Sequence, residues 1–420
     1  MLLKPLQLGF IGCDGYAFQM FKRISTVPRL AKVVAATSVQ PDSEGTRIFR
    51  EQNIPIFPTV VEMLEFGDGK FDAVVNPTPI HCHEPITIQC LEAGVPVFLE
   101  KPPVASLEEH RNLLRASEIA GLPVAVCFNT IYSILSQRLK GEIVGGRYGA
   151  LRRIRNVGAW IRPRAYYRRN DWAGRLMVGD RWVLDGTINN PFAHYIANAL
   201  YFAGPSQHSM AMPLTVEAEL YHANPIESED TSSTRIITAG GVEILSHFTL
   251  CAEEIVEPFT IIECDEAVIT FVPSVKVEIE FRNGRREVRE CYREDRMDML
   301  EELCVALRLG ERFPCDLQTC LPFTATVNAA FLSAWPTRPV PDHALRQENG
   351  NTPRTEIAGI NRDLLRAHKQ GGLLSEVGVD WARTTKPVKV TETTSVRQLI
   401  GRFPERSAPR QIRECVSPAG

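Results

Sequence analysis

The chain has 420 residues, of which 44% are hydrophobic and 23% are charged, as in an ordinary globular protein large enough for two or three domains. A formal net charge of −3 offers no global field for nucleic acid or a membrane surface, and no apolar run reaches the roughly 18 residues of a spanning helix. The 11 cysteines form no C-x-x-C pair and no apolar signal core opens the chain, so we expect a cytoplasmic protein with reduced thiols.

The first apolar run, residues 6–11, predicts a buried strand, and a helical pattern follows after a glycine-containing turn. This turn approximates the G-x-G-x-x-G/A fingerprint of dinucleotide-binding folds. Gly12 and Ala17 fit the first and third positions of the fingerprint. Asp14 occupies the second position, where its side chain adds bulk and negative charge next to a pyrophosphate, although Gly15 restores some room.

The second apolar run ends in Thr37 and Ser38. In a dinucleotide-binding fold, an acidic residue about 20 positions after the glycine turn accepts the hydroxyls of the adenosine ribose. Here the nearest acid is Asp42. Loss of the usual acid favours either a cofactor with a 2′-phosphate or a weakly bound cofactor. Arg47 and Arg50 are then phosphate partners, or simply surface charges.

Further apolar runs over residues 71–76, 95–99 and 124–128 alternate with helical patterns. Strands that alternate with helices predict an α/β fold with a doubly wound parallel sheet of the Rossmann type. His81 and His83 lie two residues apart without a further ligand cluster nearby, so we expect no metal site.

The run over residues 95–99 ends in Glu100 and Lys101. Pro102 and Pro103 prevent the strand from continuing, because proline has no N–H for the ladder. In an open parallel sheet, ligands bind in the crevice outside the carboxyl ends of the strands. Lys101 is therefore either a solvated charge at a strand exit or a group that faces a ligand.

The order of these motifs resembles the Gfo/Idh/MocA oxidoreductases, the family of glucose–fructose oxidoreductase and inositol dehydrogenase. The resemblance rests on the glycine turn, on Asn-Pro-Thr-Pro at residues 76–79 with His83 downstream, and on residues 93–97 leading into Glu100-Lys101-Pro102. It implies NAD or NADP as cofactor and places Lys101 between nicotinamide and substrate. The expected cofactor contacts are Gly12, Cys13, Asp14, Gly15, Tyr16, Thr37, Ser38, Pro77, Thr78, Pro79, His83, Glu100 and Lys101.

After residue 128 the pattern changes to strands joined by short turns, with Gly240-Gly241 and Asn283-Gly284 as hairpin signals. We therefore expect a dinucleotide-binding domain over residues 1–128 and an α+β domain with a largely antiparallel sheet over residues 129–345. Residues 346–420 are expected to be a tail that packs on the domains or is partly disordered. The resemblance implies that one face of the second sheet meets a partner subunit in a homodimer or homotetramer.

The segment from Arg152 to Trp182 is rich in arginine and aromatic residues. A nucleic-acid surface is not expected in an acidic chain, which leaves an interface or a loop over the cleft that holds a sugar-like or anionic ligand. These two interpretations are compatible. Our candidates for substrate contacts are Asn129, Arg168, Asn170 and Trp172.

The family's second signature, Asp-x-Gly-x-His, is altered in this chain. Asp185 fits its first position, Thr187 replaces the glycine, and Asn189 stands where the histidine belongs. Asparagine cannot exchange a proton near neutral pH. His194 lies five residues further on, and it reaches the site only if the backbone bends near Pro191; otherwise it is a packing histidine. The catalytic candidates are Lys101, Asp185, Asn189 and His194.

The leading interpretation is an NAD(P)-dependent oxidoreductase that acts on a sugar, polyol or related hydroxyl compound, with Lys101 at the reacting oxygen. Burial would lower the pKa of Lys101, and the Asp185 carboxylate would raise it. One alternative is an NAD-dependent glycosidase, because the same family also resembles enzymes of that class. The other is a non-catalytic ligand-binding or regulatory relative, which Asp14, the missing ribose acid and Asn189 would explain.

Overall fold

The computed structural model describes residues 4–400, and its first sheet has six parallel strands in the order β3-β2-β1-β4-β5-β6. The order reverses between β1 and β4, which creates a crevice at the carboxyl ends of these strands. The predicted Rossmann-type parallel sheet is confirmed. Its strands are β1 (Leu6–Ile11), β2 (Ala31–Thr37), β3 (Ile56–Phe57), β4 (Ala73–Asn76), β5 (Val97–Glu100) and β6 (Val124–Cys127).

Helices cover the two faces of this sheet, so that β4, β5 and β6 are buried along their whole length. Strands buried on both faces read as continuous apolar runs, which is why they were visible in the sequence. The last helix begins with a capping box between Ser106 and Glu109 and ends at Gly121, which adopts a left-handed conformation with φ +65°. The helices are α1 (Gly15–Ser25), α2 (Glu44–Glu51), α3 (Val60–Phe66), α4 (His83–Glu92) and α5 (Leu107–Ala120).

The second sheet has ten strands and is largely antiparallel. Its main path runs β16-β15-β14-β13-β7-β12-β11-β10-β17, and β20 pairs with β10. Two pairs, β7 with β12 and β10 with β17, are parallel. The strands are β7 (Leu151–Ile161), β10 (Pro213–His222), β11 (Thr231–Thr238), β12 (Glu243–Thr249), β13 (Cys251–Cys264), β14 (Ala267–Val272), β15 (Lys276–Phe281), β16 (Arg286–Glu290), β17 (Arg338–Pro339) and β20 (Val388–Lys389).

The two hairpin signals of the sequence lie at the turns that join β11 to β12 and β15 to β16, both antiparallel pairs. Gly241 and Gly284 have φ of +79° and +85°, which a β-carbon would strain. The predicted antiparallel sheet of the second domain is thereby confirmed.

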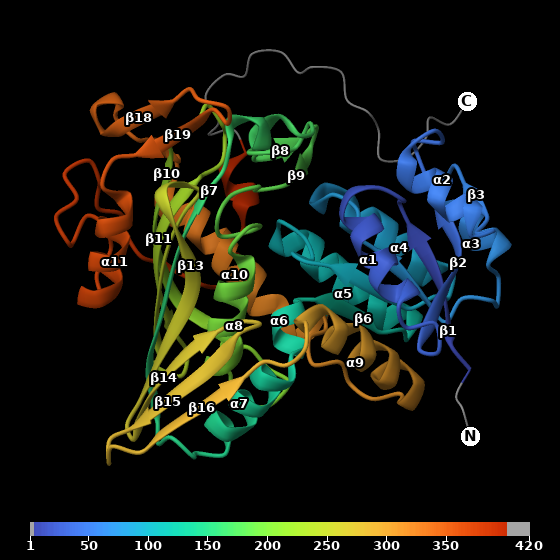
Figure 1. Cartoon of the computed structure of the whole chain (residues 1–420), viewed down its shortest axis with the longest axis horizontal. Coiled ribbons are helices and arrows are strands. Elements are labelled where there is room, and N and C mark those ends of the chain that lie inside the picture. Colours follow the sequence, from blue (N-terminus) through green and yellow to red (C-terminus); the bar gives the residue numbers. More distant parts are fainter. Residues whose placement is uncertain (1–3, 401–420) are drawn as a thin grey trace.

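Helices after the second sheet return to the first domain (Figure 1). Arg308 of α9 donates to the carbonyl oxygens of Lys4 and Leu30, each at 2.7 Å. At the edge of the parallel sheet, the N–H of Val126 donates to the carbonyl of Cys315 at 2.9 Å. The two domains are therefore joined through several crossings of the chain. The helices between the first domain and the C-terminal segment are α6 (Asn129–Tyr132), α7 (Ile134–Val144) and α8 (Ala193–Ala203), and then, after β16, α9 (Asp295–Leu309) and α10 (Leu317–Ala334).

The outer face of the second sheet, where we expected a partner subunit, carries the chain's own C-terminal segment (Figure 1). Ile360, Leu364 and Ala367 form an apolar cluster with Val157 and Ala159 of β7. Part of the predicted tail is thus a third layer on the sheet. Its elements are β18 (Leu345–Glu348), β19 (Arg354–Ile357) and α11 (Ile360–Gln370), beside the 3-10 helix η3 (Asp342–Ala344). The last 3-10 helix, η4 (Val396–Leu399), packs instead against α10.

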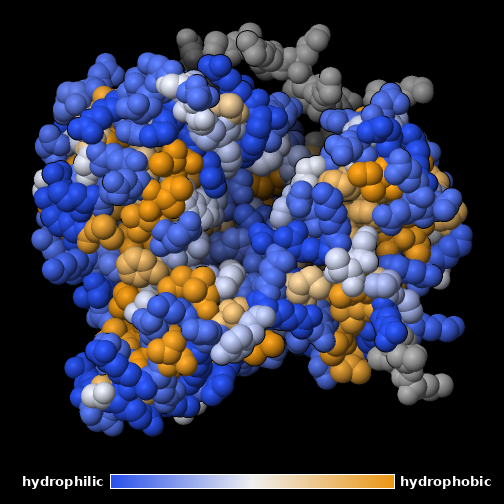
Figure 2. Space-filling model, in the orientation of Figure 1, coloured by the Kyte–Doolittle hydropathy of each residue, from blue (hydrophilic) through white to orange (hydrophobic). Residues whose placement is uncertain are grey.

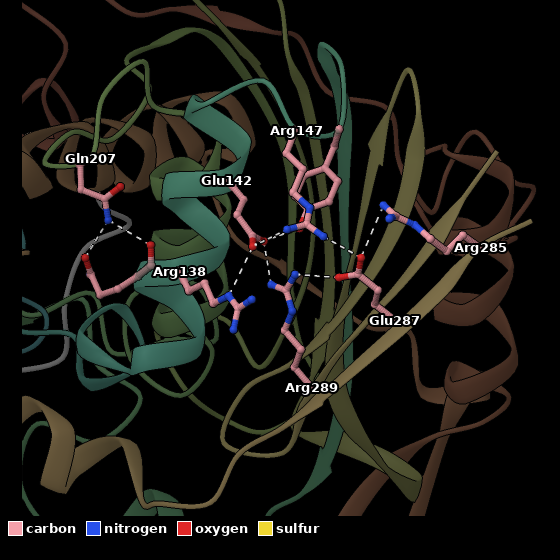
Figure 3. Close-up of polar contacts among 9 residues, drawn as sticks. Arg138, Glu142, Arg147, Gln207, Arg285, Glu287 and Arg289 are labelled. Carbon is pink, nitrogen blue, oxygen red and sulfur yellow. Dashed lines mark hydrogen bonds and ion pairs between the residues drawn. The ribbon is translucent and has the colours of Figure 1, made fainter. Parts of the chain in front are cut away.

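A network of ion pairs fastens α7 to β16 at the edge of the second sheet (Figure 3). The Glu142 carboxylate accepts from Arg147 at 3.0 Å and from Arg289 at 2.7 Å. Both arginines also reach Glu287, at 2.6 and 2.9 Å. Arg289 is the least exposed member, and its two carboxylate partners fix the last strand against the helix.

Candidate active site

Lys101 lies directly after β5, at the carboxyl edge of the parallel sheet, and its half-buried amine reaches the second domain. Nζ donates to the backbone oxygen of Asn190 at 3.0 Å and to its side-chain oxygen at 3.1 Å. Burial lowers the pKa of the Lys101 amine, and the neighbouring Glu100 carboxylate acts in the opposite direction. Figure 2 shows that the surface is hollowed between the two halves of the molecule.

The same asparagine connects Lys101 to Asp185. The Asn190 amide donates to Asp185 Oδ1 at 2.7 Å, and Asp185 Oδ2 accepts from the Gly174 N–H at 2.8 Å. Arg169 reaches the second oxygen at 3.4 Å. Burial raises the pKa of the Asp185 carboxyl, and Arg169 opposes that rise. Arg169, Asp185, Asn190 and Lys101 thus form one connected polar chain across the cleft.

His194 stands in the first turn of α8, where the charge of Lys101 acts on it. Its ring lies edge-on to Phe128 at 5.7 Å between centroids. Burial lowers its pKa well below the usual range, and the charges of Lys101 and Arg296 add to that effect. Nδ1 is buried and has no hydrogen-bond partner within residues 4–400. The His194 ring therefore has one nitrogen without a partner in this part of the chain, and it lies within the range of the Lys101 charge.

A buried carboxylate supports the turn that carries Asp185. Glu229 accepts from the Ile188 N–H at 3.1 Å and from the Thr187 hydroxyl at 3.3 Å. A β-carbon on Gly186 would lie 2.0 Å from a Glu229 oxygen, so the turn can rest on this carboxylate only with glycine there. Burial raises the pKa of Glu229 to about 7. The position of Asp185 is therefore set by Glu229, which lies in the loop between β10 and β11 of the second sheet.

Arg296, at the start of α9, brings a positive charge to the crevice from a distant part of the chain. It is hydrogen-bonded to Tyr16, in the first turn of α1, and its charge acts on Glu100, Lys101 and His194. The Arg296 side chain is 37% exposed, so it remains accessible from the cleft.

The glycine turn leaves the start of α1 open to an anion. Gly12 has φ +90°, and its N–H is bonded to Thr37 at the end of β2. Asp14 precedes α1 but makes no capping hydrogen bond, and the first turn of α1 has no acidic residue. A β-carbon on Gly15 would have no atom within 4 Å. The uncapped N–H groups and the open space fit the pyrophosphate of a dinucleotide.

The other expected cofactor residues lie around the same edge. Thr78, between Pro77 and Pro79, donates from its hydroxyl to Asn76 at 2.7 Å. His83 is buried with Nε2 at 2.7 Å from the Thr78 carbonyl and Nδ1 at 3.0 Å from that of Pro102. Burial lowers the pKa of His83 to about 4. His83 thus fixes the turn after β4 to the turn after Lys101.

The arginine- and aromatic-rich segment crosses the cleft between the domains. The guanidinium of Arg169 lies over the ring of Tyr166 at 3.8 Å and over that of Trp172 at 4.9 Å. Arg181 reaches Glu84 of the first domain at 3.4 Å. The segment contains the turn η2 (Arg164–Arg168) and the short strands β8 (Met177–Val178) and β9 (Arg181–Trp182).

The family model described as "Oxidoreductase family, NAD-binding Rossmann fold" matches residues 6–128, the stretch that forms the whole parallel sheet. Residues 6–128 form a Gfo/Idh/MocA domain. The resemblance drawn from the motifs of the sequence is confirmed by this match. The uncapped start of α1 belongs to this domain, as does Lys101.

Curated relatives match this chain over part of their length. An inositol 2-dehydrogenase of Acidothermus cellulolyticus is 29% identical over 147 residues, which cover 35% of this chain and 42% of the relative. A glycosyl hydrolase family 109 protein of Parabacteroides distasonis is 27% identical over 169 residues, which cover 36% of each chain. The matched regions therefore span less than two thirds of these relatives.

Solved structures share the fold over most of the chain. The WlbA dehydrogenase of Bordetella pertussis, in complex with NADH and UDP-GlcNAcA, has a TM-score of 0.65 at 21% identity. An oxidoreductase of Agrobacterium radiobacter, in complex with NAD+, L-tartaric acid and magnesium, has a TM-score of 0.65 at 18% identity. Each similarity covers 79% of this chain; it covers 97% of the WlbA dehydrogenase and 96% of the Agrobacterium protein, so the second domain also has the fold of these proteins.

Among the catalytic candidates, the structure brings Lys101, Asp185 and His194 together at the edge of the Gfo/Idh/MocA domain. Asn189 bonds instead to the Val183 carbonyl at 3.1 Å, and its neighbour Asn190 contacts Lys101. Asn190, Glu229 and Arg296 were not foreseen. For Asn190, its place directly after the signature was a signal that the sequence offered. Glu229 and Arg296 gave none, since they are far from the signature in the sequence.

The expected substrate residues are more scattered. Asn129 is buried at the start of α6, and Trp172 is half-buried under Arg169. Arg168 is exposed, while the Asn170 side chain accepts from the Ala173 N–H at 2.8 Å and so shapes its own turn. Within residues 4–400, no group of three or more acidic, histidine or cysteine side chains could hold a metal ion, and no helix is long and apolar enough to cross a membrane.

Proposed function

We propose that this protein is an NAD(P)-dependent oxidoreductase that moves a hydride to or from a secondary alcohol of a sugar, polyol or related compound. The observation that carries the proposal is the Lys101 amine, held by Asn190 and acting by its charge on His194, at the crevice of a Gfo/Idh/MocA domain. The similarity to an inositol 2-dehydrogenase, and to a dehydrogenase solved with NADH and UDP-GlcNAcA, supports a hydroxyl substrate.

A bound nicotinamide would supply the hydride chemistry, and the side chains supply positioning and proton transfer. Lys101 donates a hydrogen bond to the reacting oxygen and stabilises negative charge that develops there. His194 accepts the hydroxyl proton during oxidation and returns it during reduction, because its lowered pKa keeps the imidazole neutral. Asp185, acting through Asn190, holds the lysine in place.

The aromatic and cationic wall suits a polar ring. Tyr166 and Trp172 offer ring faces for a sugar, and Arg169 and Arg296 offer donors for its oxygen atoms. Arg169 is already fixed between two rings and Asp185, so it loses little freedom when a substrate binds.

Binding of NADH and NADPH to the full chain, measured by calorimetry, tests the cofactor first; absence of binding of both nucleotides would refute the proposal. Turnover is then measured with inositols, free hexoses and uronic acids, with reduced nicotinamide followed spectroscopically. We expect Lys101→Ala to bind the nucleotide but to lose about 10²–10⁴-fold in turnover. The matched control is Lys386→Ala, which removes an exposed amine and should leave both quantities unchanged.

Product analysis separates the oxidoreductase from a glycosidase, which the family 109 relative raises as a second candidate. Net accumulation of reduced or oxidised nicotinamide supports the proposal. Release of a sugar from a glycoside without net redox change supports the glycosidase. If Lys101→Ala retained full turnover, Lys101 would have no part in the reaction.

A further inference from the structure

The end of β2, where dinucleotide folds place the acid that accepts the adenosine ribose, carries Thr37 and Ser38, whose hydroxyls are already hydrogen-bonded within the loop. The Thr37 hydroxyl accepts from the Gly12 N–H at 3.1 Å. The Ser38 hydroxyl pairs with Thr46 at 2.7 Å and accepts from the Gln40 N–H at 3.1 Å. Both side chains are buried and serve the packing of the loop. The ribose hydroxyls therefore need another acceptor if a dinucleotide binds here.

Asp14 carries a carboxylate from the glycine turn to this place. Its Oδ2 accepts from the Ser43 hydroxyl at 2.7 Å, so the side chain points toward the loop between β2 and α2. It makes no capping hydrogen bond to α1, and its bond to Ser43 directs it to the start of α2 instead. The residue that looked like a defect in the fingerprint is thus directed to the ribose side of the crevice.

Close packing of α2 fixes the carboxylate in this position. A β-carbon on Gly45 would lie 2.0 Å from the Cys13 carbonyl oxygen and 2.7 Å from Asp14 Oδ1. Only glycine allows α2 to approach the turn so closely. The start of α2, with Ser43 as its capping residue, therefore packs directly against Asp14.

The geometry around Asp14 leads to a statement about cofactor choice that rests on the proposed function. We propose that Asp14 accepts the 2′- and 3′-hydroxyls of the adenosine ribose and thereby selects NAD over NADP. Asp14 is half-buried, and one bond to Ser43 leaves a carboxylate with acceptor capacity for a diol. A 2′-phosphate at the same place would be repelled by this negative charge and could not donate to it.

The basic residues of α2 do not offset this preference. Arg50 donates to the Pro41 carbonyl at 2.8 Å, which engages its guanidinium with the loop. Arg47 is exposed on the same helix. The carboxylate of Asp14 is held by the Ser43 hydroxyl and by the close packing of Gly45, whereas neither arginine is fixed toward the ribose.

The test is calorimetric titration of the full chain with NADH, NADPH and ADP-ribose at one salt concentration. Wild-type protein should bind NADH at least about tenfold more tightly than NADPH, because a hydrogen bond to a charged group contributes at least the free energy that corresponds to a tenfold change in affinity. Asp14→Asn should weaken NADH and ADP-ribose by a similar factor while leaving NADPH unchanged or tighter. Asp42→Asn removes an exposed acid of the same loop and should leave the ratio unchanged.

The outcomes separate this proposal from the proposed function. Binding of NADH and NADPH with equal affinity, or a ratio that Asp14→Asn does not change, would overturn the role of Asp14 and leave the oxidoreductase standing. If the protein bound neither NADH nor NADPH, both the role of Asp14 and the proposed function would be overturned. Since Asp14→Asn could loosen the turn, Ser43→Ala is the second variant. It removes the brace but keeps the charge, so it should retain the preference for NADH.

Discussion

Lys101 and Asp185 act on each other through a single amide, that of Asn190. The Asp185 carboxylate favours the charged form of Lys101, against the burial that lowers the lysine pKa. Asp185→Asn removes this support, so the pKa of Lys101 should fall further. If protonated Lys101 is the donor, the alkaline limb of the kcat/KM profile should move to lower pH, with turnover reduced about 10²-fold.

The pH profile of kcat/KM, measured for wild type and Asp185→Asn with the same substrate, gives the result. Asp180→Asn is the control, because this acid is exposed at the turn between β8 and β9 and should leave the profile in place. A limb that stays or moves to higher pH would show that Asp185 does not govern the proton affinity of Lys101.

The sequence located Lys101 through neighbours in the chain, but it could not assign roles among Asn189, Asn190 and His194. The expectation for His194 assumed a helix that continues from Asn189. In the structure α8 begins only at Ala193, so the preceding turn sets the angle. Arg296 comes from a helix that returns after the whole second sheet, and no local pattern can reveal such a contact.

At the scale of elements, the turn from Asp185 to Ile188 is shaped by the carboxylate beneath it. Gly186→Ala would place a β-carbon against Glu229, so the turn or the carboxylate must move. We expect a loss of about 1–3 kcal/mol in the free energy of unfolding, together with reduced turnover because Asp185 shifts.

Gly240→Ala provides the matched comparison for denaturant unfolding and turnover, because the nearest atom to its new β-carbon would be 3.9 Å away. Equal effects of the two substitutions would contradict the support of the turn by Glu229. The hairpin at Gly240 was readable in the sequence from local turn chemistry. The contact between Gly186 and Glu229 was not, because it joins two loops that are more than 40 residues apart in the sequence.

At the scale of the whole molecule, the second sheet is the middle of three layers, because other elements of the chain cover both of its faces. The inner face is covered by α8 and α10, and the outer face by α11 and its hairpin. The sequence predicted both sheets from their periodicity, but it indicated only a tail after residue 345, because apolar spacing alone does not say which surface a segment covers. The buried apolar cluster supplies that information.

Adjacent leucines on α11 test this third layer. Leu364 is 1% exposed in the cluster with β7, whereas Leu365 is 40% exposed. Leu364→Asp buries an unpaired charge and should lower the free energy of unfolding by about 3–5 kcal/mol. Leu365→Asp makes the same chemical change toward solvent and should cost less than about 1 kcal/mol. Denaturant unfolding of the full chain measures both values, and similar losses would mean that α11 does not dock on the sheet through Leu364.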